Sequence, residues 1–185
     1  MDSLEFHTTD VWNEQLWKAA EPVYTGAFPE HGRKSFAIIR NMFDRGLCQL
    51  HTADDGQVTK AMALTGIDRR ASALLIDYAA VREEERSRGL GRRLIDYLKS
   101  WGIANGCRGM VIEVEADETE ENLRRIRFWE RCGFILTEGV HQYIWVPEPY
   151  RAMVFHLQEE NRLPEDGEVL FRYITDFHKK AYRSR

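Results

Sequence analysis

The sequence has few cysteines and no long apolar run, and each scarcity excludes a class of protein. Its three cysteines, Cys48, Cys107 and Cys132, lie far apart and offer neither the close spacing of a zinc site nor an even disulfide set. No apolar run approaches the ~20 residues that span a bilayer. The N-terminus lacks a basic stretch followed by an apolar one. We therefore expect a reduced, cytoplasmic protein without a membrane segment and without a bound metal.

A strong charge of one sign is also lacking. The 26 basic and 30 acidic residues give a formal net charge of −4, which disfavours a nonspecific nucleic-acid binder. No linker rich in Pro, Gly or Ser interrupts the chain, and 43% apolar side chains suffice for one substantial core. We expect a single domain over residues 1–185, with no nucleic-acid partner.

Apolar spacing and capping residues predict helices that alternate with strands. Asp10 and Ser35 are candidate N-caps, and Gly46 and Gly133 are candidate helix ends. Helices are expected over residues 10–24, 35–46, 90–101, 122–131 and about 168–182. Strands are expected over 4–6, 47–52, 58–67, 74–81, 109–115, 134–136, 142–146 and 152–157, with a loop over 102–109 and another over 147–150.

A short turn rich in glycine and arginine links a predicted buried strand to a predicted amphipathic helix. The turn is Arg86-Ser87-Arg88-Gly89-Leu90-Gly91, and Leu90, Leu94 and Leu98 recur at helical spacing after it. The first N–H groups of a helix lack internal partners and the helix dipole is positive there, so the main chain itself can bind an anion. The alternative is a plain tight turn with solvated arginines.

Two other phosphate-binding patterns match the turn only in part. Gly89 and Gly91 follow a strand, and Glu113 lies 22 positions after Gly91, as in a dinucleotide-binding fingerprint. Leu94 stands where that fingerprint has its third glycine. A P-loop would end in Gly-Lys-Ser or Gly-Lys-Thr, which the turn lacks. Both are minor alternatives.

A second block follows the next predicted strand. It begins at Asn122, contains Trp129 and ends in Gly133-Phe134. Its apolar spacing predicts a helix that Gly133 terminates.

Together the two blocks resemble the GNAT superfamily of acyl-CoA-dependent N-acyltransferases. Arg86, Gly89 and Gly91 match the family's Arg/Gln-x-x-Gly-x-Gly/Ala turn, and Val81 lies where the family places the end of the strand that pairs with pantetheine. The resemblance covers residues 74–146 strongly. It implies an α/β (α+β) fold with a mixed, mainly antiparallel central sheet that is splayed at the acetyl-CoA site and has helices on both faces.

The resemblance also implies acetyl-CoA as co-substrate. The pyrophosphate would lie on the main-chain N–H groups of the turn, pantetheine would pair with the preceding strand end, and an N–H at or beside Val81 would face the thioester carbonyl. The implied cofactor-binding residues are Ala79, Ala80, Val81, Arg86, Ser87, Arg88, Gly89, Leu90, Gly91, Asn122 and Trp129.

Direct transfer to an amine benefits from an acid, because the departing thiolate must be protonated. Many relatives use a tyrosine at the aromatic position of the second block, where this chain has Trp129, and an indole does not supply that proton. Tyr143 is the candidate acid, and a water molecule is the alternative donor. Tyr143 has an equally good structural interpretation as a strand residue packed on the sheet.

Direct transfer also benefits from a base, since a lysine-like amine has a pKa of about 10.4. Asp77 shares a face of its strand with Ala79, and Glu113 lies near the end of the neighbouring strand. Burial would raise the pKa of either carboxyl toward a useful value. The alternatives are a structural ion pair, with Arg82 or with an arginine of the helix over 122–131, and an anchor for a water relay.

The sequence is least informative about the acceptor. The acidic residues from Glu113 to Glu121 either line the acceptor mouth, which would favour a cationic amine, or stabilise the start of a helix. His31 either contacts the acceptor or lies on a surface turn. We expect N-acetylation of a small-molecule primary amine. The alternatives are a longer acyl group, a protein or peptide amine, or a catalytically weak CoA-binding sensor. A homodimer is compatible with the resemblance, although no interface signature is visible.

Overall fold

The computed structural model describes residues 3–183, which form two compact units. The first unit comprises the described residues up to Gly66, Ile76–Leu98 and those from Lys180 onward. The second comprises Ile67–Leu75 and Lys99–Lys179. Four elements continue from one unit into the other along the chain. The single domain expected from the sequence stays a prediction.

The helices fall close to the predicted positions. The described residues form α1 (Glu14–Ala27), α2 (Phe36–Asp44), α3 (Leu90–Ala104), α4 (Glu120–Arg131) and α5 (Gly167–Tyr182), with short 3-10 helices η1 (Glu30–Gly32) and η2 (Glu83–Glu85). Within the described residues, none of these helices is long and apolar enough to cross a bilayer.

The strands also follow the predicted order. They are β1 (Glu5–Thr9), β2 (Gln49–Asp54), β3 (Thr59–Asp68), β4 (Ala73–Val81), β5 (Gly109–Glu115), β6 (Ile135–Leu136), β7 (His141–Gln142) and β8 (Pro149–His156).

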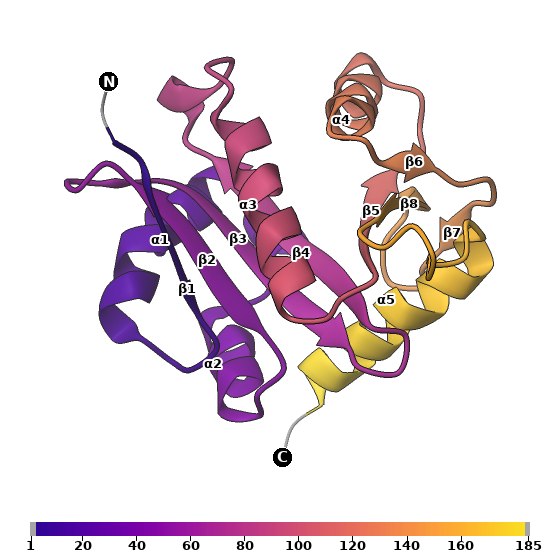
Figure 1. Cartoon of the computed structure of the whole chain (residues 1–185), viewed down its shortest axis with the longest axis horizontal. Helices are drawn as coiled ribbons and strands as arrows, with labels where there is room; N and C mark the ends of the chain where they lie inside the picture. Colours follow the sequence, from indigo (N-terminus) through magenta and orange to yellow (C-terminus); the bar gives the residue numbers. More distant parts are fainter. Residues whose placement is uncertain (1–2, 184–185) are drawn as a thin grey trace. The chain divides into compact units, whose positions relative to one another are not determined.

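In the first unit, the strands hydrogen-bond in the order β1-β2-β3-β4. β1 is antiparallel to β2, and β2 is antiparallel to β3 across the Asp54–Gly56 turn, where Gly56 has a φ of +86°. In Figure 1, α1 and α2 lie behind these strands and α3 crosses in front of them. The unit thus carries helices on both faces of its strands.

In the second unit, β4 is parallel to β5 over only three residue pairs, from Ala73↔Gly109 to Leu75↔Val111. β5 is antiparallel to β8 along its whole length, ending at Glu115↔Tyr150. β6 and β7 both pair with β8, also antiparallel. The predicted mixed and mainly antiparallel sheet is confirmed.

Two predicted helix boundaries were wrong. Asn13, not Asp10, caps α1, because the Asn13 side chain accepts a hydrogen bond from the Leu16 N–H at 2.9 Å. The loop predicted from Gly102 begins later, since α3 continues to Ala104. The Ser35 cap of α2 is confirmed, with its hydroxyl accepting from Ile38 N–H.

The strand predicted over residues 142–146 was also wrong. β7 ends at Gln142, whose side-chain amide donates to the carbonyls of Val146 at 3.0 Å and Pro147 at 3.2 Å. These bonds satisfy carbonyls of the following segment that a strand ladder would otherwise pair. Tyr143 therefore lies in a loop, and Pro149 and Tyr150, predicted as loop, lie in β8.

Candidate active site

The turn before α3 has the backbone conformation that an anion site requires. Ser87 and Gly89 have φ values of +63° and +77°, and the first helical bond runs from Arg93 N–H to the Gly89 carbonyl. The N–H groups at the start of α3 precede this bond and have no helical partner. Successive N–H groups in such a turn form a concave donor surface for an anion.

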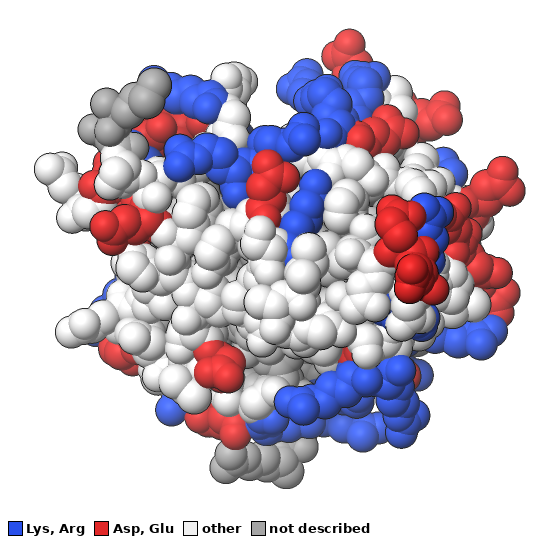
Figure 2. All heavy atoms as spheres, in the orientation of Figure 1, with Lys and Arg blue, Asp and Glu red and all other residues white. Residues whose placement is uncertain are grey.

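The turn is also open to a ligand. A Cβ atom built on Gly89 would meet no atom within 4 Å, so the positive φ of the turn explains this glycine and internal packing does not. Arg86, Ser87 and Arg88 are exposed. Figure 2 shows Lys and Arg side chains gathered around this end of α3. The chemistry of these groups fits a pyrophosphate.

The Glu85 carboxylate, beside the turn, forms ion pairs with two of the nearby basic side chains. Glu85 Oε1 lies 2.8 Å from Lys60 Nζ, and Glu85 Oε2 lies 3.4 Å from Arg88 Nη1. The hydrogen bond from Lys60 holds the pKa of Glu85 below its usual value, with smaller help from Arg88. Arg88 therefore has an ion-pair partner next to the turn, and its side chain is still 69% exposed.

The predicted pantetheine strand leaves main chain exposed. Asp77, Ala79 and Val81 are half-buried, yet the Asp77 side chain is only 3% exposed. The exposed surface of Asp77 therefore belongs mainly to its backbone. A main-chain N–H or C=O exposed along a strand is available to a ligand that pairs as an added strand would.

Asp77 forms a buried ion pair that the sequence analysis did not find. Its Oδ1 atom lies 2.8 Å from Lys34 Nζ, and the two side chains are 3% and 1% exposed. The partners suggested from the sequence are wrong: Arg82 Nε donates to the Thr59 carbonyl instead, and Lys34 occupies the place expected for an arginine. Among the described residues, the buried Asp77 Oδ2 atom has no hydrogen-bond partner.

Aromatic residues enclose this ion pair. The Tyr24 hydroxyl donates to the Lys34 carbonyl, the Lys34 N–H donates to the Tyr78 hydroxyl, and Lys34 Nζ lies 5.2 Å from the Tyr78 ring and 5.4 Å from the Tyr182 ring. Burial raises the pKa of both Tyr24 and Tyr78, and the Asp77 charge adds to the rise. Both phenols therefore stay protonated at neutral pH.

The predicted acid and base meet in the second unit. The Tyr143 hydroxyl donates to Glu113 Oε2 at 2.6 Å, and His178 Nε2 lies 3.2 Å from Glu113 Oε1. Tyr143 is 7% exposed, and the Glu113 side chain is 24% exposed. β5 positions Glu113, and α5 positions His178, a residue that the sequence analysis missed because only the apolar repeat of its helix was recognised.

Aromatic side chains surround Tyr143. Its ring stacks on Trp145 at 5.0 Å and meets Tyr150 edge to face at 5.5 Å. Burial raises the pKa of Tyr150 to about 12, and the charges of Glu113, Glu115 and Glu148 add to the rise. Tyr150 therefore stays neutral at physiological pH.

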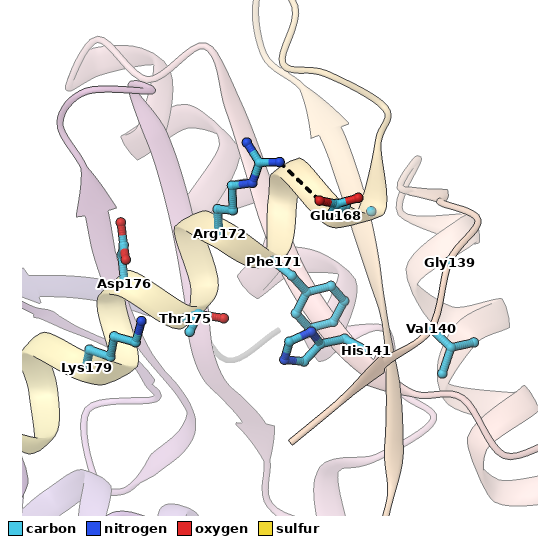
Figure 3. Close-up of a pocket in the computed structure, with 10 residues that line it drawn as sticks. Gly139, Val140, His141, Glu168, Phe171, Arg172, Thr175, Asp176 and Lys179 are labelled. Carbon is cyan, nitrogen blue, oxygen red and sulfur yellow. Dashed lines mark hydrogen bonds and ion pairs between the residues drawn. The ribbon is translucent and has the colours of Figure 1, made fainter. Parts of the chain in front are cut away.

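A pocket of about 530 Å³ adjoins this aromatic group (Figure 3). His141 stacks on Phe171 at 4.4 Å within it, and both rings contact Tyr143, at 4.5 and 6.4 Å. The pocket is lined by one face of α5 and the segment before β7, namely Gly139, Val140, His141, Gly167, Glu168, Phe171, Arg172, Thr175, Asp176 and Lys179.

The second predicted cofactor-binding block lies in α4, in the second unit. Asn122 is 5% exposed, and its side-chain amide donates to the Asp117 carbonyl at 3.0 Å. Trp129 is 8% exposed and meets Phe134 edge to face at 5.0 Å. Both residues therefore organise the start and the packing of α4, and their contact with a cofactor stays a prediction.

The remaining candidates lie at exposed positions. Glu120 and Glu121 occupy the first turn of α4 after the Thr119 cap, which supports the helix-start interpretation for these two residues. His31 lies exposed in η1, and its contact with an acceptor stays a prediction.

Glu5, His7 and Asp54 lie close together on β1 and β2, with His7 Nε2 3.2 Å from Asp54 Oδ2. The metal-free site expected from the sequence stays a prediction.

Comparison with known proteins gives one family match and several matches in fold. A family model described as "Acetyltransferase (GNAT) family" matches residues 13–134. No curated protein matches the chain.

Solved structures match more widely. A protein described as a GNAT-family acetyltransferase from Bacteroides thetaiotaomicron is 21% identical, with 98% of this chain and 99% of that chain covered and a TM-score of 0.74. The ribosomal-protein-S18-alanine N-acetyltransferase from Escherichia coli is 16% identical (83% and 95% covered, TM-score 0.61). A spermidine N-acetyltransferase chimera that includes the Vibrio cholerae protein is 14% identical (83% and 95% covered, TM-score 0.63). At these identities the likeness shows the fold alone.

The buried ion pair makes a prediction about stability. Replacing Lys34 by Met or Asp77 by Leu alone is expected to lower the free energy of unfolding by about 3–5 kcal/mol, because each change leaves a buried charge uncompensated. The double variant is expected to recover most of the loss, since no buried charge remains. Urea unfolding at pH 7 measures all three. Losses that simply add in the double variant would contradict this account of the pair.

Proposed function

The chain belongs to the GNAT family of acetyltransferases, and from this premise we propose that it transfers the acetyl group of acetyl-CoA directly to a primary amine of a small molecule. The observation that carries the proposal is the turn before α3. Positive φ values at Ser87 and Gly89, open space beside Gly89 and exposed arginines suit a pyrophosphate.

The first unit would hold the acetyl donor along one stretch of chain. The N–H groups of Arg88–Gly91 would bind the pyrophosphate, and the side chains of Arg86 and Arg88 would add positive charge. The main chain of Ala79–Val81 would pair with the pantetheine amides. The N–H at or beside Val81 would stabilise negative charge on the thioester oxygen, an effect worth on the order of a hundredfold in rate.

Tyr143 and Glu113 are the proposed proton donor and acceptor. Their 2.6 Å hydrogen bond supports the assignment, because it joins the two groups that transfer needs. Trp129 supplies no proton, since an indole is not an acid at neutral pH and this one is packed against Phe134. Asp77 is the second candidate base, but its ion pair with Lys34 gives it an adequate structural role.

The pocket beside Tyr143 supports a small-molecule acceptor. Its volume of about 530 Å³ lies within the range of roughly 300–1,000 Å³ that is ordinary for small-ligand sites. His141 and Phe171 connect the pocket wall to the Tyr143 ring. An acceptor seated there would lie against His141 and Phe171, whose rings contact Tyr143, the hydrogen-bond partner of Glu113.

The phosphate assignment predicts a specific effect at Gly89. Gly89→Ala is expected to weaken acetyl-CoA binding by about tenfold or more, because the new methyl group points into the open space where the phosphate would approach. Gly46→Ala is the matched control, since Gly46 also has a positive φ, +64°, and open space around its Cβ position. Isothermal titration calorimetry measures both. Equal affinities for the two variants would place the phosphate elsewhere.

The proposed chemistry predicts a loss of turnover with intact donor binding. Tyr143→Phe and Glu113→Gln are each expected to lower kcat by about 10²- to 10⁴-fold without changing acetyl-CoA affinity. Thiol release from acetyl-CoA with a panel of small primary amines and lysine peptides measures this. Turnover with peptides alone would favour a protein acceptor, and tight acetyl-CoA binding without any turnover would favour a sensor.

The choice of base has its own control. The double variant Lys34→Met with Asp77→Leu removes the second candidate carboxylate without leaving a buried charge. It is expected to keep turnover if Glu113 accepts the proton. If the double variant loses turnover and Glu113→Gln keeps it, Asp77 is the group that accepts the proton.

A further inference from the structure

Both oxygens of the Glu113 carboxylate have partners. Oε2 accepts from the Tyr143 hydroxyl at 2.6 Å, and Oε1 lies 3.2 Å from His178 Nε2. The side chains of His178 and Glu113 are 17% and 24% exposed. A carboxylate held on both oxygens has one orientation rather than the two or more that a free side chain samples.

Helix α5 fixes the imidazole in this arrangement. Phe171 and His178 are seven residues apart on α5 and therefore lie on the same face of the helix. Phe171 stacks on His141, and the His178 ring meets the Tyr143 ring nearly at right angles, at 6.3 Å and 80°. A single helix face thus contacts both the wall of the pocket and the proposed acid and base.

We propose that His178 is a positioning residue that holds Glu113 against Tyr143, so that acid and base act as one hydrogen-bonded unit. This inference rests on the proposed acyl transfer to an amine. The imidazole Nε2–H donates to Oε1 and directs Oε2 toward the Tyr143 hydroxyl. His178 acts through Glu113 and does not itself touch the reacting atoms.

The unit can carry one proton from nitrogen to sulfur. As the amine forms its bond to the acetyl carbon, an N–H bond breaks and the proton goes to Glu113. The C–S bond breaks, and the Tyr143 hydroxyl gives its proton to the departing sulfur. Glu113 then returns the first proton to the Tyr143 oxygen across their hydrogen bond. One proton has moved from amine to thiol, and both side chains end as they began.

A double-mutant cycle tests whether His178 acts through Glu113. His178→Leu is expected to lower kcat by roughly tenfold to a hundredfold, the usual effect of losing a hydrogen bond to a charged group. KM and acetyl-CoA affinity are expected to stay unchanged, and His178→Gln, which keeps an N–H donor, to restore most of the rate. In the Glu113→Gln background, His178→Leu is expected to cause no further loss.

A matched variant controls for a general structural effect. His156 Nε2 lies 2.7 Å from Glu165 Oε1, so His156→Leu breaks a similar histidine–glutamate contact elsewhere in the second unit. It is expected to leave kcat within about twofold of wild type. Equal losses for His156→Leu and His178→Leu, or losses that multiply in the cycle with Glu113→Gln, would overturn the proposal.

A readout without turnover separates this inference from the proposed function. In ¹⁵N-labelled protein, the His178 Nε2–H is expected to give a slowly exchanging NMR signal that disappears in Glu113→Ala. If the wild type acetylates no amine in the panel, the proposed function fails. The NMR signal still shows whether His178 holds Glu113 by a hydrogen bond. Its loss in Glu113→Ala supports the contact, whereas its persistence overturns it.

Discussion

The short ladder between β4 and β5 is the constraint on which the site depends. It joins three residue pairs and ends at Leu75, whereas β5 pairs with β8 through all seven of its residues. Among the described residues, the β4–β5 register ends at Leu75, so the main-chain groups farther along that edge of β4 need other partners. Asp77 shows the consequence, because its side chain is buried while its backbone is partly exposed. Partly exposed strand backbone and the glycine turn that we propose as the pyrophosphate site therefore follow each other in one stretch of the first unit.

The Lys34–Asp77 pair and the Glu113 group differ in burial and therefore in what they can do. The Lys34 and Asp77 pair is almost completely buried and enclosed by rings, which suits a fixed structural role. Glu113 is partly exposed and contacts a phenol and an imidazole. Loss of the usual tyrosine at Trp129 is therefore compatible with catalysis, because Tyr143 offers a phenol from a different segment.

The sequence predicted the features that depend on local pattern. The turn at Gly89 and the Ser35 cap are local, since a few adjacent residues determine their conformation. The ion pair of Lys34 with Asp77 joins residues 43 apart, and nothing in either local pattern indicates the other. Tyr143 and Glu113 were both predicted, but their contact, like that of His178, depends on how β5, α5 and the loop after β7 pack.

We propose above all that the main chain from Val81 to Gly91 binds coenzyme A. Amide NMR spectra recorded while CoA is added to the ¹⁵N-labelled protein test it most directly. We expect the largest shifts at the N–H groups of Val81 and of Arg88–Gly91, because these donors would gain a partner on binding. Binding that shifts other amides and leaves these unchanged would contradict the account.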